Sequence, residues 1–79
     1  MSAMFEIYYK APADPKKEEF LSETIAGHGG LITFREEPTT GGWHQAIILT
    51  CEFETWPQAE VAADKLRAMG EHVEGPCDY

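Results

Sequence analysis

The order of the expected secondary structure constrains this chain more than any single motif does. A strand-like passage, a capped helix and a second strand occupy residues 4–36, and the same order returns over residues 45–74. Two such passages in 79 residues make one small domain, residues 1–79, in which residues 1–3 and 75–79 are expected to be tails. The chain therefore has to bury one face of a single sheet beneath two helices.

Local signals divide the chain into its elements. Asp14 followed by Pro15 predicts a helix start, and Thr55 with Gln58 forms the capping-box pattern of a second helix. The turn-forming residues 38–42 predict a hairpin between the two halves. Alternation of apolar side chains, or a short apolar run, predicts strands over residues 4–9, 31–36, 45–53 and 72–74.

This order of elements resembles the ferredoxin-like sandwich. The fold class that the resemblance implies is α+β: a βαββαβ sandwich whose four-stranded antiparallel sheet has the strand order 4-1-3-2, with two helices on one face. The apolar run Ala46-Ile47-Ile48-Leu49 suits a central strand, and the short polar strand near the C-terminus suits an edge. The resemblance extends over nearly the whole chain, but it rests on pattern and not on a functional motif.

The charge balance excludes several classes of partner. Fourteen acidic residues against six basic ones give a formal charge of −8, which repels phosphate backbones and anionic membrane surfaces. We therefore expect no nucleic-acid partner and no membrane association. No secretory signal is visible, no segment has the ~20 consecutive apolar residues of a membrane span, and the two cysteines do not form a disulfide framework. These features predict a cytoplasmic protein.

Missing motifs separate the chain from known functions of this fold. The metal-transfer domains need a Cys-x-x-Cys in the loop after the first strand, where this chain has residues 10–14, Lys-Ala-Pro-Ala-Asp. Acylphosphatase-like enzymes need an arginine-bearing phosphate loop at the same place. RNA-recognition motifs need aromatic and basic residues on the central strands, and iron–sulfur ferredoxins need four cysteines. None of these patterns occurs, so we expect no cofactor.

Candidate metal ligands and catalytic groups do not gather in the expected topology. The possible ligands His28, His44, His72, Cys51 and Cys77 fall toward opposite ends of the sheet, without paired short spacing. We therefore expect no metal site. The carboxylate pairs are typical of a solvated acidic rim, and no nucleophile stands beside an obvious base. The chain is more consistent with a binding domain than with an enzyme.

The sheet face that the helices leave open is the most promising functional surface. If odd-numbered positions of the first and third strands face the helices, the open face has an apolar centre, and a monomer seldom leaves such a patch bare. We predict that this face mediates self-association or docks a protein partner or small ligand. Cover by the C-terminal tail is the alternative. The residues predicted to bind, on the open face and in the hairpin, are Tyr8, Ile48, Thr50, Arg35 and Trp43.

Two other functions stay open from the sequence. One is a small dimeric α+β-barrel enzyme with a pocket between helices and sheet around Tyr9, His44 and His72. The other is a small-ligand sensor, although the glycine-lined loop expected after the first strand is missing. The alanine stripe Ala59, Ala62 and Ala63 predicts a tightly closed interior, which disfavours the enzyme.

Overall fold

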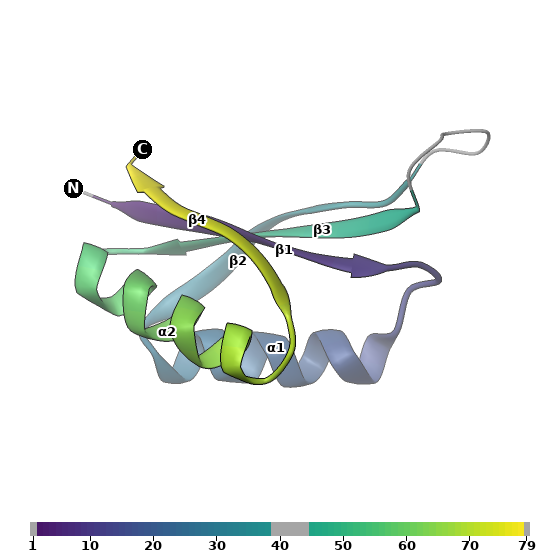
Figure 1. Ribbon diagram of the computed structural model, residues 1–79, viewed down its shortest axis with the longest axis horizontal. Helices are drawn as coiled ribbons and strands as arrows, with labels where there is room; N and C mark the ends of the chain where they lie inside the picture. Colours follow the sequence, from purple (N-terminus) through teal and green to yellow (C-terminus); the bar gives the residue numbers. More distant parts are fainter. Residues whose placement is uncertain (1, 39–44, 79) are drawn as a thin grey trace.

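The computed structural model describes residues 2–38 and 45–78, and its elements follow the expected βαββαβ order. The strands form one antiparallel sheet in the order β2-β3-β1-β4, which is the expected order read from the other edge. Both helices cover the same face of this sheet, so the fold is the ferredoxin-like sandwich (Figure 1). The elements are β1 (Ala3–Lys10), α1 (Pro15–Gly27), β2 (Gly30–Glu36), β3 (Ala46–Phe53), α2 (Trp56–Ala68) and β4 (His72–Asp78).

Both helices begin at the predicted caps. The Asp14 side chain accepts a hydrogen bond from the backbone N–H of Lys17, and Pro15 occupies the first helical position. In α2 the Thr55 hydroxyl accepts from the backbone N–H of Gln58, whose side-chain oxygen in turn accepts from the N–H of Thr55. These bonds satisfy backbone donors that have no partner within the first turn of a helix. The two helix starts are confirmed.

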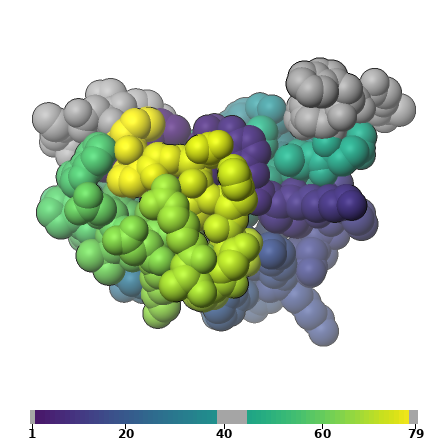
Figure 2. Space-filling view, viewed as in Figure 1, coloured from purple at the N-terminus to yellow at the C-terminus, as the bar shows by residue number. Residues whose placement is uncertain are grey.

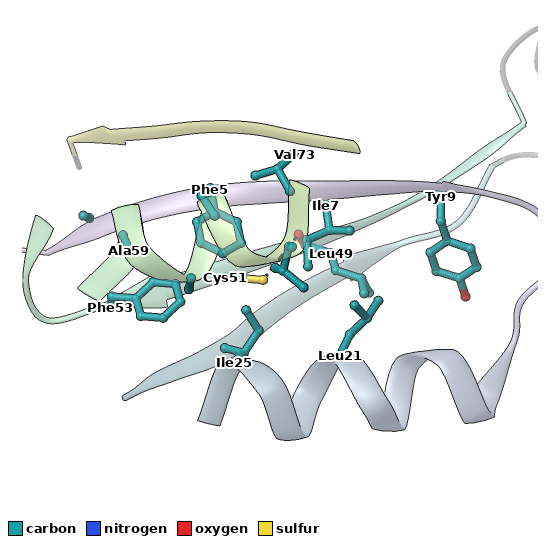
Figure 3. Packing of buried hydrophobic residues seen from close by; sticks show 14 of the residues in the cluster. Phe5, Ile7, Tyr9, Leu21, Ile25, Leu49, Cys51, Phe53, Ala59 and Val73 are labelled. Atoms are coloured by element: carbon teal, nitrogen blue, oxygen red, sulfur yellow. Dashed lines mark hydrogen bonds between the residues drawn. The ribbon is translucent and has the colours of Figure 1, made fainter. Parts of the chain in front are cut away.

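The hydrophobic core lies between the sheet and the helices (Figure 3). Alternate residues of β1 and β3 point into it, and the Phe5 and Phe53 rings lie 5.2 Å apart. Small side chains on the buried stripe of α2 let this helix approach the sheet closely. The largest completely buried side chains are Phe5, Ile7, Leu21, Ile25, Ile47, Leu49, Leu66 and Cys51.

The C-terminal strand is longer than the sequence predicts. Residues 75–78 were expected to be a tail, but β4 continues through Gly75 and Pro76 to Asp78. The ladder between β4 and β1 shifts register at this point, and Gly75 adopts a positive φ of 112°. A glycine adopts that backbone conformation without steric cost, so the strand continues beyond Gly75-Pro76, two residues that in the sequence indicate the end of a strand. Ala3, at the other terminus, already belongs to β1.

The opposite face of the sheet carries no helix in the part of the chain that the structure describes (Figure 1). The predicted turn and Trp43 lie outside the described residues. Neither of the two described helices is long and apolar enough to span a membrane.

Candidate functional site

A β-bulge in β2 decides which side chains reach the open face of the sheet. The pairing of β2 with β3 shifts register at Thr33, after which Phe34 lies opposite Thr50 and Arg35 lies opposite Leu49. One additional residue in a strand moves every later side chain to the other face. Phe34 therefore lies on the open face and Arg35 on the helix side. The prediction that Arg35 belongs to the open face is wrong.

Three predicted site residues do lie on the open face. Tyr8 pairs with Ile48 across β1 and β3, and Thr50 pairs with Glu6 two positions further along. Thr50 is only 8% exposed, because side chains of the neighbouring strands flank it, so it offers little surface to a partner. Tyr8 and Ile48 are half-buried. The structure thus brings these three residues together on one surface but without Arg35, and Trp43 lies outside the described residues.

Exposed apolar surface on this face is concentrated in β2. Leu31 is 70% exposed and Phe34 is 60% exposed, which are the largest values among the large apolar side chains of the described residues. The register places both on the same face as the half-buried side chains of Met4 and Ile48. The sequence analysis did not place Phe34 on this surface. No signal in one strand could have revealed it, because the bulge depends on the pairing with β3.

Carboxylates dominate the charge of the open face. Glu6 and Glu74 lie directly opposite each other on β1 and β4. Lys10, opposite Ala46, is the one lysine or arginine that the strand pairings place on this face within residues 2–38 and 45–78. The carboxylates of this face are Glu6, Glu36, Glu52 and Glu74. The face therefore combines apolar side chains, which are exposed mainly on the edge strand β2, with carboxylates on all four strands.

The polar side chains on the β4 side of the open face contact one another. The Tyr8 hydroxyl donates to Glu6 at 3.1 Å, and the Tyr8 ring meets the His72 ring edge-on with centroids 5.6 Å apart. His72 Nε2 lies 3.2 Å from Glu74 Oε1. Burial, and then the hydrogen bond to Glu6, raise the pKa of Tyr8. Tyr8 is consequently a neutral phenol that can contact a ligand but not act as a base.

On the helix side, Arg35 joins β2 to α1. Its Nε donates to Glu18 Oε1 at 2.6 Å, its Nη2 donates to Glu18 Oε2 at 2.9 Å, and its Nη1 donates to Glu37 at 2.8 Å. The Tyr9 hydroxyl also donates to Glu18 and accepts from the backbone N–H of Asp14 at 3.1 Å. This arrangement holds the first turn of α1 against the end of the sheet.

The electrostatics of this cluster leave no group poised for acid–base chemistry. Arg35 is the largest influence that lowers the pKa of Glu18, and Glu18 in return raises the pKa of Arg35. Burial, followed by the hydrogen bond to Glu18, raises the pKa of Tyr9. At neutral pH Glu18 is ionised, Arg35 is charged and Tyr9 keeps its proton. The cluster is a structural tie with its hydrogen-bonding groups engaged.

The structure separates two of the three residues around which a barrel-type enzyme pocket was expected. Tyr9 faces the helices, whereas His72 lies on the open face beside Tyr8, and His44 lies outside the described residues. A shallow hollow of about 230 Å³ lies at the end of the sheet where β2 begins. Its lining is Ser2, Gly29, Leu31, Thr33, Glu52, Phe53 and Glu54.

The cysteines and histidines that the structure describes form no metal-ligand cluster. Groups of three or more potential ligands are absent from the described residues. Cys51 is completely buried, and burial raises the pKa of its thiol to about 12, which makes it unreactive at neutral pH. Cys77 is an exposed thiol on β4, opposite Met4. The two cysteines are not bonded to each other.

Comparisons with known proteins give no assignment. No protein-family model, no curated protein and no solved structure matches this chain. Its function therefore has to be argued from the surface described above.

Proposed function

We propose that this domain is a protein-binding module whose open sheet face docks a partner that carries both apolar and basic side chains. The observation that carries the proposal is the exposure of Leu31 and Phe34 on an otherwise uncovered, acidic sheet face. Burying such side chains is the main favourable term in protein association. The surrounding carboxylates supply the orientation and the selectivity for a cationic partner.

The charge distribution favours a basic partner over a second copy of the chain. Two copies meeting face to face would bring Glu6, Glu36 and Glu74 of each near those of the other. Like charges across an interface are unfavourable and also slow the encounter. Arg35 cannot offset them, because the bulge turns it away to Glu18. The overall charge of −8 adds long-range attraction for a cationic partner.

The other two functions gain no support of this kind. Tyr9 and His72 lie on opposite faces of the sheet, so a single enzyme pocket cannot use both. The Tyr9 hydroxyl is engaged with Glu18 and with the backbone N–H of Asp14, so it is not directed toward a small ligand. Both cysteines are free thiols, which fits the reducing cytoplasm where we place the proposed binding activity.

The test is a nuclear magnetic resonance titration of the isotope-labelled domain with a short peptide of alternating leucine and lysine. We expect shift changes on the open-face residues of β2 and β3. The exposed part of Phe34, about 120 Å² of a side chain of about 200 Å², contributes up to about 3 kcal/mol if a partner buries it. Phe34→Ser should therefore weaken peptide binding by at least about tenfold.

Phe20→Ser is the matched control, because Phe20 is 50% exposed on α1 and not on the sheet. This variant should leave peptide affinity unchanged, and a peptide of alternating leucine and glutamate should not bind. Equal losses in the two phenylalanine variants, or shift changes on the helices, would contradict the proposal. A stable dimer in light scattering that dissociates on Ile48→Glu would contradict it too, and would identify a second copy as the occupant.

A further inference from the structure

The two edges of the sheet differ in how their backbone groups are occupied. β2 and β4 are the edge strands. A free edge presents a row of N–H and C=O groups that another strand can pair with, and proteins usually block it. The state of each edge therefore indicates where a strand can be added.

The β4 edge is occupied by a side chain of α2, the helix that lies directly against this strand (Figure 2). The Arg67 guanidinium donates to the carbonyl oxygen of Val73 at 3.1 Å and to that of Gly75. These two carbonyls are two residues apart, so they point to the same side of the strand. Pro76 has no N–H to offer. An added strand would have to displace Arg67 from both carbonyls.

Helix α1 packs against β2 and the bulge at Thr33 interrupts its ladder, but no side chain is described on the backbone of this edge within residues 2–38 and 45–78. None of the hydrogen bonds described there joins a side chain to the backbone of Gly30–Glu36, and this strand contains neither proline nor lysine. Leu31 and Phe34, at 70% and 60% exposed, belong to the same strand. Leu31 lies on the open face through its pairing with Glu52, and the bulge at Thr33 brings Phe34 to the same face. An added strand would therefore place its apolar side chains directly beside them.

We propose that the partner docks as an extended segment that adds to β2 as a fifth strand of the sheet. This inference rests on the proposed function and specifies the class of partner: a segment in which apolar and basic residues alternate. Backbone pairing with β2 supplies affinity, and contact with Leu31 and Phe34 supplies selectivity for its apolar residues.

The charges near β2 favour such a segment over the β2 strand of a second copy. Glu36 and Glu37 lie at the C-terminal end of β2, and Glu52 pairs with Leu31 at the other end. A second copy would bring only Arg35 as a cation on this strand, and its donors are already engaged by Glu18 and Glu37. A segment with accessible lysines is attracted where a second β2 is not.

The test measures isotope-filtered nuclear Overhauser effects between the labelled domain and the unlabelled leucine–lysine peptide. Strand addition predicts contacts between backbone protons of the peptide and those of β2, with none to β4. It also predicts that β2 amides pointing away from β3 exchange at least about tenfold more slowly with saturating peptide. Phe34→Ser should weaken these contacts and Phe20→Ser should preserve them.

Each other result would overturn the inference in a distinguishable way. Contacts confined to the side chains of Leu31, Phe34 and Ile48, without β2 backbone contacts, would mean docking on the face without strand addition and would leave the proposed function standing. Backbone contacts to β4 would show that the wrong edge had been chosen. Failure of the peptide to bind at all would overturn the proposed function together with this inference.

Discussion

Replacing Glu18 by glutamine tests the tie between α1 and β2. The substitution keeps the size of the side chain and one oxygen acceptor but removes its charge. In the native protein Glu18 receives two hydrogen bonds from Arg35, at 2.6 and 2.9 Å, and a third from Tyr9. The Glu18 side chain is 18% exposed and that of Arg35 is 35% exposed, so water screens the pair in part. We expect Glu18→Gln to cost about 1–2 kcal/mol of unfolding free energy.

Glu37→Gln is the matched control, since Glu37 contacts the same arginine through a single bond while its own side chain is 59% exposed. This variant should stay within about 0.5 kcal/mol of the wild type. Urea unfolding followed by circular dichroism at pH 7 measures both changes. A domain of this size loses about 1 kcal/mol per molar urea, so Glu18→Gln should lower the midpoint by about 1–2 M.

The pH dependence supplies a second and independent check. The pKa of Glu18 is lower in the folded protein than its ordinary value of 4.5, because Arg35 stabilises the charged form. Its contribution to stability is therefore fully present above pH 4.5 and is lost as the pH falls through the folded-state pKa. The difference between wild type and Glu18→Gln should narrow toward zero in acid. Equal costs for the two variants, or a difference that persists in acid, would refute the position of Arg35 on the helix side.

Two further outcomes follow from burial and from close packing. At about pH 8 a thiol reagent should modify Cys77 in the folded protein and reach Cys51 only after unfolding. The reason is that burial raises the pKa of the Cys51 thiol to about 12. Rapid modification of both thiols would contradict this prediction. Gly30→Ala should destabilise the domain by about 1–3 kcal/mol, since its new methyl group would overlap the Phe53 ring. In the control variant Gly27→Ala the new methyl group meets no neighbour within 4 Å, so thermal unfolding should show a neutral or slightly stabilising effect. An equal loss of stability in both variants would show that the lack of space at residue 30 is not the cause.

The fold could be predicted from the sequence because the signals that specify it are local. The caps at Asp14 and Thr55 depend on residues within one helical turn, and both are present as expected. Alternation along β1 and β3 is likewise a property of a single strand, and it placed Tyr8 and Ile48 on the correct face. Right-handed crossover then left few arrangements for two β-α-β passages.

The candidate site could be predicted from the sequence only in part, and the errors in its prediction have one physical origin. Arg35 was assigned to the wrong face, Phe34 was missed, and residues 75–78 were mistaken for a tail. All three lie at or beyond a point where an edge strand changes register against its neighbour. A bulge is a property of two paired strands, so its position is not written in either strand alone.

Sequence by itself determined the order of elements, the helix caps, the acidic charge and the buried stripes, because each of these depends on residues close together in the chain. Only the tertiary structure decided which edge of the sheet is blocked and what the open face displays. Arg67 contacts the backbone of β4 because α2 packs against that strand, and Phe34 lies on the open face because of the register in which β2 pairs with β3. Long-range contacts fix both features, and the proposed binding function depends on them.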